Sequence, residues 1–191
     1  MGKTYEEIDA RLRAFIEAQA VFFVATAPLA ADGHVNLSPK GRDSLRILDG
    51  NRLAYLDLVG SGAETIAHVR ENRRIVLMWC AFEGPPKIVR VHGHARILEP
   101  SHADFATLRA RFSEGPVGRA IVEVEATRIS DSCGYGVPLY GFKQERSQLV
   151  DWAERKEEAE LRAYQRKKNA RSIDGLPAIT WLDPRSEGAK T

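Results

Sequence analysis

Hydrophobic and polar positions follow two different periods along this chain, and the changes of period predict its elements. Over residues 4–19 the apolar side chains recur at helical spacing, which predicts an amphipathic helix with Thr4 as its cap. From residue 20 onward, strict alternation or short apolar runs take over, and both are typical of strands. The predicted strands span residues 20–27, 34–38, 44–48, 52–58, 74–82, 87–98 and 118–130.

Turns and short helices separate these strands. The Asp-Gly pair at 49–50 predicts a hairpin, and the Gly-rich turn at 60–62 opens a helix expected over 63–71. Ser101 is expected to cap a helix over 101–112, and a helical tail is expected over 143–169. Strands joined mainly by hairpins, with helices at the margins, predict a mainly β (α+β) fold built on a closed antiparallel barrel.

Composition narrows the class of protein. The chain has 191 residues, of which 43% are hydrophobic, so it can bury one sizeable core. A net charge of +2, with charges of alternating sign in the tail, does not favour a nucleic-acid or membrane partner. No apolar run approaches the ~20 residues of a membrane span, and the N-terminus is polar where a signal peptide would be apolar. We therefore expect a cytoplasmic protein.

The stretch VNLSPKG at 35–41 carries the first candidate chemistry. In a strand, Asn36, Ser38 and Lys40 share one face and offer an amide, a hydroxyl and an ammonium donor in a row. Pro39 and Gly41 then end the strand. Such a row suits a flat heterocycle rich in carbonyl acceptors.

The Gly-rich turn in GSGAETIAHVREN is the second candidate. A glycine turn that opens a helix presents free backbone N–H groups and the positive end of the helix dipole to an anion. Ser61 and Thr65 could add hydroxyl donors. The alternative is a helix start that needs flexible glycines and binds no anion. Because strands linked by hairpins are usually neighbours, we expect this turn to meet the donor row and hold a phosphate. An exposed Lys40 is expected to supply the positive charge.

The succession of SPKG, YLDLVGSGAETIAHVRENRRIVLMW and RVHG resembles the pyridoxamine 5'-phosphate oxidase-like FMN-binding split-barrel family over about residues 15–130. The resemblance implies a six-stranded antiparallel split β-barrel, a homodimer, and FMN bound in the groove between the subunits. The segment 132–140 resembles the cover that one subunit lays over the flavin of the other, although a plain surface loop is an equal alternative. The cofactor-binding residues implied by motif position are Asn36, Ser38, Pro39, Lys40, Gly41, Ser61, Gly62, Glu64, Thr65, Arg90 and Tyr135.

The sequence departs from the family pattern at two places. The oxidases carry an Arg-Lys pair at the phosphate turn, where this chain reads GSGAE, so the charge partner must be Lys40 or an arginine such as Arg42, Arg70 or Arg73. The oxidases also end in an Arg-x-His substrate motif, whereas this tail reads GLPAITWLDP. Oxidation of vitamin B6 itself is therefore not expected.

No metal site is expected. His92 and His94 share one face of a strand at a spacing that can chelate a metal, but no carboxylate or cysteine ligand lies near them in sequence. Cys80, inside an apolar run, is expected to be a buried hydrophobe, and Cys133 to be incidental. His68 is expected to be structural.

These observations together predict a split-barrel domain over residues 1–142 and a helical extension over 143–191 that packs on the barrel or on a dimer partner. The expected function is FMN binding and oxidoreduction of an unidentified small molecule by hydride transfer at the flavin N5. Two alternatives stay open at this stage. A split barrel of this kind could use a deazaflavin or haem, and a flavin-binding or storage protein could lack turnover altogether.

Overall fold

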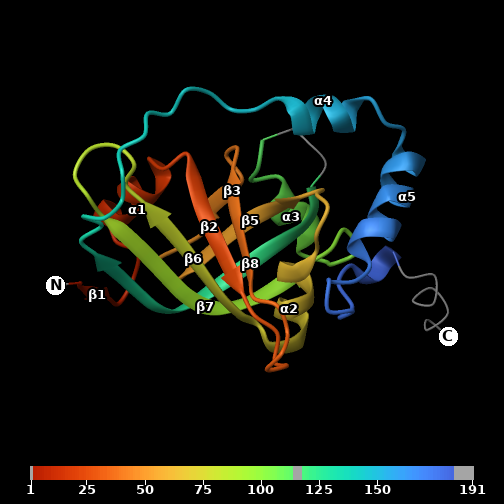
Figure 1. The fold of residues 1–191 in the computed structure, drawn as a ribbon, viewed down its shortest axis with the longest axis horizontal. Coiled ribbons are helices and arrows are strands. Elements are labelled where there is room, and N and C mark those ends of the chain that lie inside the picture. The colour runs from red at the N-terminus through yellow and green to blue at the C-terminus, as the bar shows by residue number, and fades with distance from the viewer. Residues whose placement is uncertain (1, 114–117, 183–191) are drawn as a thin grey trace.

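The computed structural model describes residues 2–113 and 118–182, which form one antiparallel sheet with helices around it (Figure 1). No helix within these ranges is both long enough and apolar enough to cross a membrane. The strands are β1 (Thr4–Tyr5), β2 (Val21–Thr26), β3 (Asn36–Gly41), β4 (Leu45–Ile47), β5 (Arg52–Leu58), β6 (Arg74–Cys80), β7 (Ile88–Leu98) and β8 (Gly118–Ser132). The helices are α1 (Ala10–Glu17), α2 (Glu64–Asn72), α3 (Phe105–Arg109), α4 (Gln148–Glu154), α5 (Glu158–Asn169) and the 3₁₀ turn η1 (Thr180–Leu182).

The sheet curls into a barrel that stays split. Its strand order is β3-β2-β6-β7-β8-β5-β4, with β1 paired to β8, so β3 and β4 stand at opposite ends. Only residues 42–44 connect those two strands, and a chain spans at most ~3.3–3.6 Å per residue, so the ends must approach each other. Among the described strands, no pairing joins β3 to β4. The split-barrel prediction is confirmed, but the expected count of six strands is wrong, because the described sheet has eight. Among them, β1 is a short strand that the sequence pattern missed.

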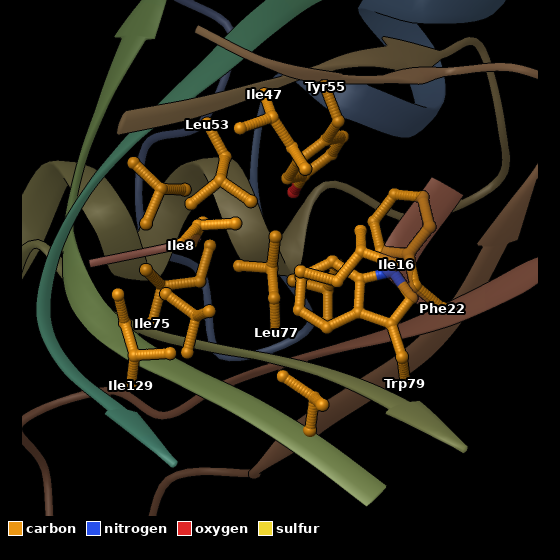
Figure 2. Packing of buried hydrophobic residues seen from close by; sticks show 14 of the residues in the cluster. Ile8, Ile16, Phe22, Ile47, Leu53, Tyr55, Ile75, Leu77, Trp79 and Ile129 are labelled. Carbon is orange, nitrogen blue, oxygen red and sulfur yellow. The ribbon is translucent and has the colours of Figure 1, made fainter. Parts of the chain in front are cut away.

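The barrel interior is filled by the apolar residues of alternating strand positions (Figure 2). Phe22 of β2 stacks on Trp79 of β6 at 5.9 Å between ring centroids and meets Tyr55 of β5 edge-on at 5.7 Å. Ile8 and Ile16 pack against the same cluster from the N-terminal region. Each large apolar side chain buried in this way contributes about 1.5–3 kcal/mol, so the interior is the main source of stability.

The predicted N-terminal helix over 4–19 is too long, and its cap is wrong. Helix α1 begins at Ala10, and the carboxylate of Asp9 accepts a hydrogen bond from the backbone N–H of Leu12 at 2.8 Å. Thr4 belongs to β1, which pairs with Ser130 of β8. Tyr5 holds this strand in place by donating to Asp131 at 2.5 Å. Pairing with a long neighbouring strand satisfies backbone groups that a frayed first turn would leave to water.

Two further helix predictions need correction. The predicted helix over 101–112 shortens to α3, because the chain first turns back at residues 99–102, where the His102 N–H donates to the Glu99 carbonyl at 2.8 Å. Ser101 is therefore not its cap. The predicted tail helix over 143–169 starts only at residue 148 and is divided into α4 and α5. A reciprocal capping box between Glu157 and Glu160 opens α5 and explains the division.

Candidate functional site

The donor row on β3 faces inward, as the alternation predicts. Asn36, Ser38 and Lys40 are half-buried, whereas Leu37 and Pro39 on the opposite face are exposed. The register pairs the three inward residues with Thr26, Val24 and Phe22 of β2, two of which belong to the barrel interior. Ser38 has no described side-chain partner among residues 2–113 and 118–182, so its hydroxyl is available to a ligand.

The amide of Asn36 joins this row to the start of α2. Asn36 Nδ2 donates to Thr65 Oγ1 at 2.9 Å and approaches Thr26 Oγ1 at 3.2 Å. Thr65 lies in the first turn of α2, immediately after the Gly-rich turn. The two predicted pieces therefore meet. We predicted this meeting because strands linked by hairpins are usually neighbours, and that reason was wrong. Strand β3 is not a sheet neighbour of β5, the strand that leads into the turn. They meet because the sheet curls.

A buried ion cluster lies beside this contact. Asp57 at the end of β5 accepts hydrogen bonds from Lys40 Nζ at 2.8 Å and from Arg119 Nε at 2.7 Å, and its side chain is 1% exposed. Burial opposes ionisation of Asp57, but the charges of Lys40 and Arg119 outweigh it and lower the pKa of this carboxyl. Lys40 is only 21% exposed and is paired with Asp57, so the prediction of an exposed lysine was wrong.

Arg119 reaches Asp57 because of a β-bulge. Asp57 pairs with Ala120 and Leu58 pairs with Gly118, so Arg119 is an extra residue on β8. An extra residue of this kind re-aims its side chain, here into the interior. The sequence signal that could have revealed Arg119 is a lone charge in the otherwise apolar start of the strand GRAIVEV.

Two further polar groups are buried next to the row. His68 Nδ1 lies 3.0 Å from Thr26 Oγ1, and burial lowers the pKa of His68, which favours the neutral imidazole. Burial also raises the pKa of Tyr55 well above its usual value, so the phenol stays protonated. His68 Nε2 and the Tyr55 hydroxyl make no hydrogen bond of ordinary geometry to the described part of the chain. His68 was predicted to be structural, and that prediction does not account for the unpaired Nε2.

The C-terminal tail covers one side of the Gly-rich turn. Asn169 at the end of α5 donates to the carbonyl of Gly60 at 2.9 Å and lies 3.4 Å from that of Gly62. The backbone N–H of Ile173 donates to Glu64 at 3.3 Å. These contacts use carbonyl and carboxylate oxygens, and α2 has no side-chain cap for its first N–H groups. Ser61 in the same turn is exposed. The helix start therefore keeps its anion-binding donors.

Two predicted site residues lie apart from this group within the single chain. Arg90 sits on the face of β7 opposite the buried Val89 and Val91 and donates to Ser132 at 3.0 Å. Tyr135 is 82% exposed on the segment that leaves β8 and crosses to α4 outside the barrel (Figure 1). None of the contacts described for these two residues involves the β3 row.

Comparisons with known proteins agree with this arrangement of elements. A family model described as pyridoxamine 5'-phosphate oxidase matches residues 8–133, which is more than half of the chain and includes β3, β5 and α2. The chain belongs to the pyridoxamine 5'-phosphate oxidase family. A member of this family from Aspergillus flavus, the pyridoxamine 5'-phosphate oxidase family protein ustO, is 35% identical over 192 residues. The match covers 92% of this chain and 77% of that protein.

A solved structure of a HupZ variant from Group A Streptococcus shares the fold. Its TM-score to this chain is 0.51 at 23% sequence identity, and the match covers 65% of this chain and 99% of the other. The family model and this solved structure match the barrel, whereas the match to the Aspergillus flavus protein covers 92% of the chain and so extends into the tail. The tail that reaches Gly60 and Gly62 lies beyond the residues that the family model matches.

Proposed function

We propose that this protein binds FMN, with the phosphate at the start of α2 and the flavin ring along Asn36, Ser38 and Lys40, and that it acts as an oxidoreductase. The observation that carries the proposal is the 2.9 Å hydrogen bond from Asn36 to Thr65. This bond places the strand donors next to the uncapped helix start, so one phosphorylated heterocycle could use both.

The charges around the row suit a phosphate of this size. Lys40 and Arg119 share the single carboxylate of Asp57, which leaves one excess positive charge, and the α2 N-terminus adds a partial charge of about +0.5. Glu64 in the first turn of α2 carries a negative charge that opposes them, and its carboxylate accepts a hydrogen bond from the N–H of Ile173. Ser38 and the backbone N–H groups of the turn supply neutral donors. In this proposal, these charges and donors take the place of the Arg-Lys pair of the oxidases. Because that pair is missing, we do not propose vitamin B6 as the substrate.

A bound flavin would supply hydride transfer, and the residues of the chain would bind and orient it. Asp57 fixes the Lys40 ammonium, and Thr65 fixes the Asn36 amide, so both donors are held before a ligand arrives. The buried, protonated Tyr55 and the neutral His68 keep this end of the barrel free of further charge. The substrate or electron donor is a small molecule whose identity these groups do not specify.

A second copy of the chain is part of the proposal. Large apolar side chains are exposed on two segments, with Leu29, Val35 and Leu37 around β3, and Tyr135, Leu139, Tyr140 and Phe142 after β8. Large apolar side chains exposed close together in sequence are candidates for an interaction surface. In a two-fold dimer, the segment after β8 would serve as the cover of the partner's cofactor. Light scattering at micromolar concentration tests the dimer, and a monomer mass would count against it.

The visible spectrum of the protein as purified, with mass identification of the released ligand, tests the cofactor. FMN is expected, while deazaflavin, haem or no ligand would each overturn the proposal. Ser38→Ala should weaken FMN binding by roughly two- to tenfold, the worth of one neutral hydrogen bond, with the unfolding temperature unchanged. Ser101→Ala, at an exposed serine far from β3 in sequence, is the matched control. Reduction of the bound flavin by NADPH or NADH separates an oxidoreductase from a storage protein.

A further inference from the structure

A separate cavity of about 300 Å³ lies where the start of β8 meets α5 and η1. No residue of β3 contributes to its walls. The residues that line it are Pro100, Gly118, Arg119, Glu158, Leu161, Arg162, Gln165 and Trp181. The cavity thus belongs mainly to the tail and reaches the barrel only through the first residues of β8.

Three polar atoms of this lining are buried and have no partner. Arg119 Nη1, Gln165 Oε1 and Trp181 Nε1 make no hydrogen bond within the described ranges 2–113 and 118–182. Arg119 is 5% exposed and Gln165 is 3% exposed, so bulk water does not solvate their side chains. Buried polar atoms almost always have a partner, and three orphans around one cavity point to a molecule that fills it.

The charges of the lining select an anion with one negative charge. Arg162 is bonded to Glu158, which balances it. Arg119 shares Asp57 with Lys40, so this second group holds two cations and one carboxylate. Arg119 reaches Asp57 through Nε, which leaves Nη1 for another acceptor. The apolar Leu161 and Pro100 complete the walls.

We propose that this cavity binds a small hydroxycarboxylate. Its carboxylate would accept hydrogen bonds from Arg119 Nη1 and Trp181 Nε1, and its hydroxyl would donate to Gln165 Oε1. A volume of about 300 Å³ is at the small end of ligand pockets and, at ~30 Å³ per water-sized group, admits a molecule of up to roughly ten non-hydrogen atoms, which includes the small hydroxycarboxylates. None of the three ligand-facing atoms belongs to the β3 row or to α2, but the excess charge of the Lys40, Arg119 and Asp57 group also serves the proposed phosphate site, so lactate binding is measured on the FMN-free protein.

Isothermal titration calorimetry on the full chain tests this site with three probes: lactate, propionate, which lacks the hydroxyl, and lactamide, which lacks the charge. Lactate should bind at one site, propionate roughly two- to tenfold more weakly, and lactamide at least roughly tenfold more weakly. Gln165→Leu should lower the affinity for lactate to that for propionate and leave the affinity for propionate unchanged. Trp181→Phe should weaken both acids, since the indole N–H serves the carboxylate.

Two controls keep the result specific. Trp152→Phe alters a tail tryptophan that packs on Tyr164 and does not line the cavity, so it should leave lactate binding unchanged. Ser38→Ala should weaken the binding of FMN but not of lactate, and Trp181→Phe should weaken the binding of lactate but not of FMN. This pair of results tests the cavity separately from the proposed cofactor site. Absence of lactate binding, equal binding of lactate and lactamide, or full affinity in both cavity variants would overturn the proposal. A crystal grown in lactate that shows only water bridging the three atoms would overturn it too.

Discussion

Lys40 donates a hydrogen bond to Asp57 at 2.8 Å, although β3 and β5 stand first and sixth in the strand order of the sheet. The ion pair therefore spans the open side of the barrel, where no backbone ladder is described. Asp57 is also held by Arg119 from the bulge of β8. The cluster connects β3, at one end of the sheet, with β5 and β8 near the other end, at the position where the candidate cofactor site begins.

Lys40→Ala is expected to destabilise the cofactor-free protein by about 1–3 kcal/mol, because it leaves the buried Asp57 with Arg119 as its remaining cation. Urea denaturation of the apo protein measures this difference. Lys143→Ala, at an exposed lysine for which the described residues offer no partner, should change stability by no more than about 0.5 kcal/mol. Equal stability of Lys40→Ala and the parent would show that the cluster does not hold the barrel together.

Asp57→Asn is expected to destabilise the protein at neutral pH and to lose that effect in acid. The pKa of Asp57 is lowered in the folded state, so ionised Asp57 stabilises the fold above the ordinary carboxyl pKa of about 3.9. That contribution disappears as the pH falls through the lowered folded pKa. Denaturation curves of parent and variant at several pH values should therefore converge below about pH 4. A constant difference down to the lowest accessible pH would contradict the assignment.

Docking of the tail onto the β2–β3 loop is expected to weaken in base. His34 Nδ1 lies 2.6 Å from Asp174, and the hydrogen bond and charge of Asp174 raise the pKa of His34. A raised pKa means that the stabilisation is complete below the ordinary histidine pKa of about 6.5 and is lost as the pH rises through the folded pKa. Trypsin cleavage after the exposed Arg171 should therefore be slower at about pH 6 than at about pH 9, relative to a peptide substrate. His34→Gln should remove the difference.

Asn169→Ala is expected to release the tail from the Gly-rich turn. The buried amide of Asn169 serves the carbonyls of Gly60 and Gly62, and its loss leaves both without that donor. We expect a loss of stability of about 1–3 kcal/mol and faster hydrogen exchange in the first turn of α2. Lys168→Ala changes the exposed neighbour on the same helix and should alter neither quantity. Unchanged exchange in α2 after Asn169→Ala would show that the tail does not brace the turn.

Local pattern was enough to predict the positions of the strands other than β1, and the inward face of β3, because period-two alternation fixes which side chains share a face. The predicted end of β3 at residue 38 was wrong, since the strand pairs with β2 through Pro39 and Lys40 to Gly41. The cluster at Asp57 could not be predicted, since the charge at Arg119 marks the residue in the sequence but not the one-residue register shift that turns it toward Asp57. The contact of Asn169 with Gly60 joins positions 109 residues apart. Thr4 was the predicted helix cap, and the pairing of β1 with β8, which no local pattern shows, places Thr4 in a strand and leaves Asp9 as the cap.

The split in the barrel leaves β3 as an outer strand, since β2 is its one described neighbour in the sheet. An edge of this kind is a template onto which a foreign strand can add, and long fibrous aggregates grow in that way. Pro39 has no N–H to donate to an added strand. The same short segment that forms the donor row therefore also protects the chain from self-association through its open edge.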